Sequence, residues 1–161
     1  MASYLEGAGV TNLAKVFPHP PKITPEGLFV VKGEDPGHSM GTVMYIYLGE
    51  HHEKRKSTGG PHSGWKQRDY TTKLVCFTRS VTGKAPDCGI QSDNFLDSLT
   101  GVIEAQRTAN SNGVIFQWGE GNQGIGSPDI MVEATMPRVV RGQLAQVYSV
   151  VTVTTVEMLL S

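Results

Sequence analysis

The chain has 161 residues, of which 39% are hydrophobic and 18% are charged, enough to form one domain with a buried core and too apolar for a wholly disordered protein. Its 14 basic and 15 acidic residues give a net charge of −1, so a generally basic nucleic-acid-binding protein is not expected, although a local basic patch is compatible with these numbers. The charge is uneven, with a net of +3 in residues 1–80 and −4 in residues 81–161.

The first 40 residues are expected to form an arm with little regular structure, followed by a core at residues 41–161 of a single domain. Residues 11–17 favour a short helix, which the three prolines between positions 18 and 21 would end because proline blocks helix continuation. The apolar run at residues 28–31 predicts a short strand or an extended segment.

Two strands are predicted next, at residues 42–48 and 70–78, because both segments are rich in β-branched and aromatic side chains. Residues 49–66 between them are polar and contain several glycines, which predicts a long loop. Loops of this length without structure of their own are usually functional or disordered.

A helix is predicted from about Asp93 to Arg107, with Ser92 as its N-cap. Its apolar side chains recur at helical spacing and form one stripe, which comprises Phe95, Leu96, Leu99, Val102 and Ile103. Such a stripe must pack against another surface.

Three strands are predicted after the helix, at residues 114–118, 129–135 and 145–157. The expected fold class is therefore α+β: a mostly antiparallel sheet of about five strands with one main helix packed on one face, and a long loop after the first strand. One helix covers only one side of such a sheet. Either the N-terminal arm folds over the other apolar side, or another subunit covers it.

Each sequence motif that could indicate catalysis or cofactor binding lacks a part that its chemistry requires. Residues 119–124 match the G-x-G-x-x-G spacing of a dinucleotide site, but no helix follows and no acid lies at the required distance, so a flexible glycine-rich loop is favoured. Cys76 lies in a predicted strand and Cys88 has no neighbouring base, and a disulfide between them is not expected in a reducing compartment. We therefore predict no catalytic residues and no cofactor.

The polar segment at 50–62 leaves open one alternative function, which belongs to a different class of protein. Three of the five histidines, His51, His52 and His62, lie there beside acidic residues, which suggests a small metal-dependent enzyme or a ligand-binding domain. Adjacent side chains in an extended segment point to opposite sides, however, and no H-E-x-x-H or paired-cysteine pattern is present. No metal site is predicted.

The same segment supplies the candidate interface residues. A short basic run lies at residues 54–56, and a tryptophan follows in the polar loop, where large aromatic side chains often mark interfaces. The interface hypothesis comprises His52, Lys54, Arg55, Lys56 and Trp65.

From about Tyr70 to Glu157 the chain resembles the tail terminator proteins of long-tailed bacteriophages, small neck proteins that cap the tail tube. The resemblance rests on the order and spacing of a strand at 70–78, the helical segment D-N-F-L-D-S-L at 93–99, a strand ending in W-G-E-G at 118–121, a strand at 129–133 and a final valine-rich strand. The preceding segment at 47–55 is also similar to the opening strand and loop of the family.

The resemblance implies a non-enzymatic structural protein of the virion that forms a homo-oligomeric ring of six copies. The implied partners are other copies of the chain, the tail-tube protein and the head-side connector protein, with DNA passing through the lumen without sequence-specific binding. A tail-tube or head-closure subunit of the same neck is the alternative. No membrane-spanning run and no secretory signal are visible, so synthesis inside a cell is expected. The resemblance implies that this cell is the bacterial host, with synthesis in its cytoplasm and a final place in the virion tail.

Overall fold

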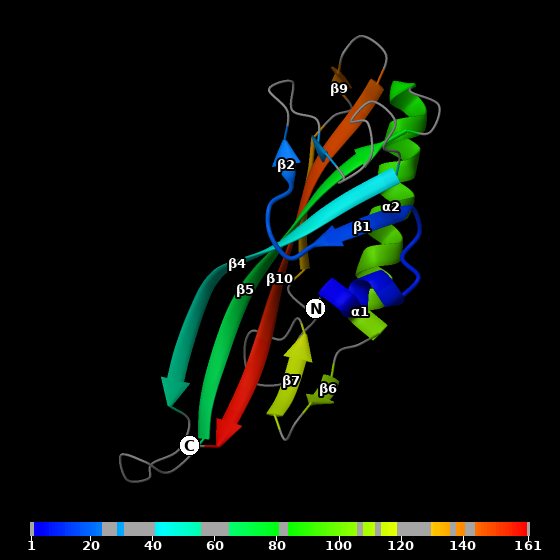
Figure 1. Ribbon diagram of the computed structural model, residues 1–161. Coiled ribbons are helices and arrows are strands. Elements are labelled where there is room, and N and C mark those ends of the chain that lie inside the picture. Colours follow the sequence, from blue (N-terminus) through cyan, green and yellow to red (C-terminus); the bar gives the residue numbers. More distant parts are fainter. Residues whose placement is uncertain are drawn as a thin grey trace. The chain divides into compact units, whose positions relative to one another are not determined.

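The computed structural model describes residues 2–23, 29–30, 41–55, 65–80, 84–105, 108–111, 114–118, 130–135, 138–140 and 144–160. Its contacts divide the chain into two units. Unit 1 comprises residues 1–47, 74–102 and 132–151, and unit 2 comprises residues 48–73, 103–131 and 152–161. Three long strands contribute residues to both units (Figure 1).

The main sheet has the order β1-β4-β5-β10-β7-β6, and two further short strands, β8 and β9, pair with β10. The strands and their bounds are β1 (Leu13–Phe17), β4 (Gly41–Arg55), β5 (Trp65–Arg79), β6 (Thr108–Ser111), β7 (Val114–Trp118), β8 (Ile130–Ala134), β9 (Arg138–Val140) and β10 (Leu144–Leu160). A separate two-stranded sheet contains β2 (Lys22–Ile23) and β3 (Phe29–Val30). Pairing is antiparallel between β10 and β7, β10 and β9, and β6 and β7, whereas β1 and β4 run parallel.

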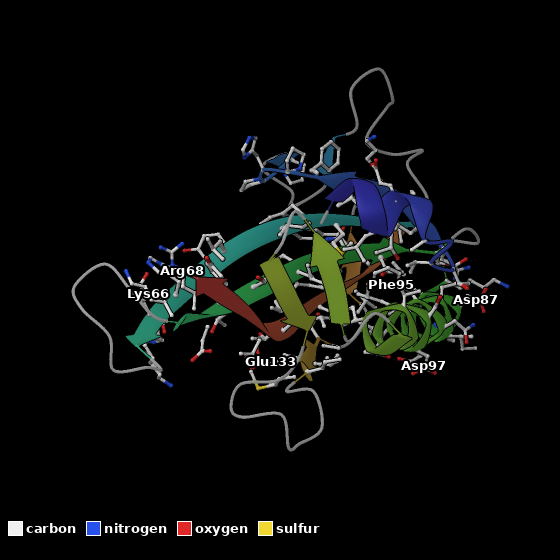
Figure 2. All side chains as sticks on the ribbon, turned by 90° about the horizontal axis from the view of Figure 1, so that it is seen from below. Lys66, Arg68, Asp87, Phe95, Asp97 and Glu133 are labelled. Carbon is white, nitrogen blue, oxygen red and sulfur yellow. The ribbon has the colours of Figure 1, made fainter. Side chains whose placement is uncertain are left out.

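The helix α2 (Ala85–Ala105) packs on one face of the sheet in unit 1. The Cys88 thiol on this helix donates hydrogen bonds to the carbonyl oxygens of Thr78 at 3.3 Å and Ala145 at 3.4 Å, and so connects the helix to β5 and β10. The predicted apolar stripe is confirmed, because Phe95 and Leu99 are fully buried. In Figure 2 the labelled Asp87 and Asp97 lie on the outer side of this helix, away from Phe95.

These elements confirm the predicted α+β class with one main helix on a mostly antiparallel sheet. The helix begins eight residues before the predicted start. Pro86 is compatible with this earlier start, because proline lacks only an amide proton that the first turn of a helix leaves unbonded. The predicted loop at 49–66 is also too long: residues 49–55 continue β4, and β5 begins at Trp65.

The predicted helix at residues 11–17 is wrong, because residues 13–17 form β1. Backbone contacts with β4 override the local helical preference there, in a parallel pairing that aligns Val16 with Met44. The chain turns into β1 at Asn12, whose φ is 61° and whose carbonyl oxygen accepts a hydrogen bond from the Thr42 amide at 2.8 Å. Residues 2–23 also contain the helix α1 (Ala2–Gly7), so this segment has more regular structure than expected.

Candidate functional site

The sheet face opposite α2 in unit 1 carries a row of three aromatic side chains, one from each central strand. Tyr45 on β4 stacks on Phe77 of β5 with ring centroids 6.4 Å apart. Phe77 also contacts Tyr148 on β10, at 5.3 Å with the rings tilted by 60°. We call Tyr45, Phe77 and Tyr148 the aromatic row.

A buried apolar cluster surrounds the aromatic row. Val43 and Val75 are buried with Phe77, and Val150 packs against them from β10. Phe17 of β1 also packs against the cluster, so the N-terminal segment contributes to this side of the sheet. Part of this side is therefore covered by the N-terminal segment, which was one of the two alternatives that the sequence left open.

Apolar side chains nevertheless remain open to solvent around the row. Tyr148 is 39% exposed, and Tyr47, which shares a strand face with Tyr45 by alternation, is 54% exposed. The face thus combines a buried centre with large apolar groups in contact with water, as in surfaces that bind another protein.

Thr135 fixes the end of β8 beside the aromatic row. Its amide donates a hydrogen bond to the Tyr148 carbonyl oxygen at 2.8 Å, and its hydroxyl donates to the same oxygen at 3.1 Å. The Tyr148 amide in turn donates to the Thr135 hydroxyl oxygen at 3.2 Å. The position of Tyr148 in the backbone is therefore held by several hydrogen bonds.

Burial changes the acid–base behaviour of two side chains on this face. Burial raises the pKa of the Tyr45 phenol, with a smaller contribution from Tyr148. Arg79 is fully buried, donates from its Nε to the Gln146 Oε1 at 3.3 Å and has a pKa lowered by burial to about 10. Its guanidinium therefore stays charged at neutral pH.

The ends of β4 and β5 in unit 2, residues 48–55 and 65–73, form a second surface, which we call the charged hairpin. One carboxylate, that of Glu53, is shared by two cations: Arg68 Nε lies 2.7 Å from it and Lys66 Nζ lies 3.3 Å from it. These hydrogen bonds, that of Arg68 first, lower the pKa of Glu53 below its usual value. The three side chains together carry one net positive charge (Figure 2, which labels Lys66 and Arg68).

The candidate interface residues fall on or beside the charged hairpin. His52 and Lys54 are exposed on β4, and Lys54 pairs with Asp69 at 3.3 Å. Arg55 and Trp65 lie in β4 and β5, but their side chains are outside the described part of the chain, as is all of Lys56.

The histidines do not converge in the residues that the structure describes. His51 stacks on Tyr70 with centroids 6.2 Å apart, whereas His52 lies 3.9 Å from the Glu50 carboxylate. His62 lies outside the described residues. Across the described ranges, no three His, Cys, Asp or Glu side chains form a group able to hold a metal ion.

Cys76 and Cys88 are both buried and free. Burial raises the pKa of both thiols, to about 12 for Cys76, so neither is a thiolate at neutral pH. The structure uses Cys88 to hold the helix on the sheet, a role that the sequence did not reveal.

Sequence reasoning also missed the aromatic row. Its members are far apart in the sequence, and only the strand pairing brings them together. The available signal is alternation along the last strand, which puts Tyr148 and Val150 on the opposite side from the buried Val147 and Val151.

Neither a model of a known protein family nor a curated protein matches this sequence. Within the described residues, the structure has no helix with the length and apolar character required to cross a membrane.

Proposed function

We propose that this chain is a structural virion protein, a phage tail terminator that forms a homo-oligomeric ring, caps the tail tube and joins it to the head-side connector. The observation that carries the proposal is the partly exposed aromatic row and its neighbour Tyr47 on the sheet face opposite α2. Burying these side chains against another copy of the chain removes apolar area from water, which is the main driving force for association.

The resemblance to tail terminators supports the proposal through the order of the elements. The helix, the strands that follow it and the valine-rich last strand lie in the order on which that resemblance rests. The near-neutral chain also suits a channel through which DNA must slide, because each neutralised phosphate would hold DNA by counterion release.

Negative-stain electron microscopy of the purified full-length chain tests the proposal. We expect closed rings one subunit thick. Long tubes formed by the chain alone would instead favour the alternative of a tail-tube subunit. Particles with no ring or tube, both alone and after mixing with a tail-tube protein, would contradict both.

A further inference from the structure

The outer side of α2 carries an acidic stripe with one large apolar side chain beside it. Asp93 and Asp97 are both exposed and lie one helical turn apart, and Ile90, one turn earlier, is 60% exposed. Like charges at this spacing repel each other and destabilise a helix. Residues 85–105 contain four acidic residues and neither Lys nor Arg, so the helix itself does not offset this repulsion.

The charged hairpin has the opposite sign. Residues 48–55 and 65–73 contain five Lys or Arg and three Asp or Glu, a net of +2. At its centre Lys66 and Arg68 share the single Glu53 carboxylate, which holds both cations in place and leaves one positive charge uncompensated within this group of three. The chain therefore carries both halves of a complementary pair.

We propose that the acidic stripe of α2 docks on the charged hairpin of a second copy of this chain. The inference rests on the proposed ring, since it adds a charged contact to the subunit boundary at which the aromatic row is buried. Two different surfaces give a head-to-tail contact, which repeats from copy to copy until a ring closes. Ile90 lies on the same outer side as the acids, and docking would cover it.

Charge complementarity selects a second copy as the partner. A polyanion such as DNA is attracted to the charged hairpin but repelled by the acidic stripe. A basic protein is attracted to the acidic stripe but repelled by the charged hairpin. A second copy satisfies both surfaces at once. The contact should weaken as salt screens the charges.

Two reversed variants of the full-length chain test the inference. The first is Asp93→Lys with Asp97→Lys, which makes the stripe basic. The second is Glu53→Lys with Lys66→Glu, Arg68→Glu and the exposed Lys73→Glu, which keeps opposite charges paired around position 53 and changes the net charge of residues 48–55 and 65–73 from +2 to −2. Asp93→Glu with Asp97→Glu is the matched control, because it changes the same two exposed positions and keeps their negative charge.

Sedimentation velocity reads out assembly, and far-ultraviolet circular dichroism checks folding. Each reversed variant alone should need about tenfold or more protein for half-assembly, because like charges then face each other across the boundary. An equimolar mixture of the two should assemble like the wild type in an alternating ring, since every boundary again joins opposite signs. The Asp93→Glu, Asp97→Glu control should assemble normally.

The outcomes separate this inference from the proposed function. If the wild type forms rings while both reversed variants also assemble normally, or if the mixture does not recover, the docking inference is wrong but the ring stands. If the wild type forms no ring, the proposed function fails first. If a reversed variant does not fold, assembly of the wild type is measured at about 0.05 M and at about 0.5 M salt instead. A ring that is equally stable at both salt concentrations would overturn the inference.

Discussion

Gly41 begins β4 in a backbone conformation that other residues rarely adopt. Its φ is 86°, and a Cβ at this position would lie 3.0 Å from the Asn12 carbonyl oxygen. We expect Gly41→Ala to lower the free energy of unfolding by about 1–3 kcal/mol, measured by urea denaturation. Gly101→Ala is the control: Gly101 is exposed in α2 with nothing within 4 Å, and alanine should stabilise the helix by about 0.5–1 kcal/mol. Equal effects at both sites would contradict the strained geometry at Gly41.

The Glu53 carboxylate is the residue whose titration reports on the charged hairpin. Its pKa is lowered from the usual 4.5, so its contribution to stability is present above that value and is lost as the pH falls through the lower pKa of the folded chain. Carbon-detected NMR titration should show Glu53 titrating below 4.5, and Arg68→Gln should raise its pKa. A Glu53 pKa unchanged by Arg68→Gln would show that the 2.7 Å contact does not persist in solution.

At the scale of the elements, α2 is held by its buried stripe. Phe95→Ala should cost about 3–5 kcal/mol in the free energy of unfolding, because it leaves a cavity beneath the helix, whereas Asn94→Ala on the exposed side should cost less than about 1 kcal/mol. Thermal and chemical denaturation measure both. A Phe95→Ala chain as stable as Asn94→Ala would mean that the helix is not packed on the sheet as described.

The sequence predicted the elements whose residues carry a clear periodic pattern, and it misassigned those that tertiary contacts define. The stripe of α2 and the valine-rich last strand were both identified. Residues 49–55 were assigned to a loop, since a strand with charged side chains on both faces has no apolar alternation to detect. Residues 11–17 were assigned to a helix, since parallel pairing with β4 cannot be read from a local segment.

At the scale of the whole molecule, the candidate surfaces lie where sequence prediction is weakest. The interface hypothesis around His52 and Lys54 placed one candidate surface on the polar segment between the first two central strands. His52 and Lys54 remain candidate interface residues. The aromatic row depends on three strands that come together only in the fold, so no local pattern identified it.

The central claim is that the chain associates with itself through the exposed part of the sheet face opposite α2. The most direct test compares the wild type with Tyr148→Lys in sedimentation velocity over a range of concentrations. Tyr148 is 39% exposed, so a lysine here should leave folding intact while placing a charge in the contact. We expect a discrete ring-sized species for the wild type and a shift toward monomer for Tyr148→Lys, with unchanged circular dichroism. A wild type that stays monomeric at every concentration, or a Tyr148→Lys chain that assembles as the wild type does, would contradict the account.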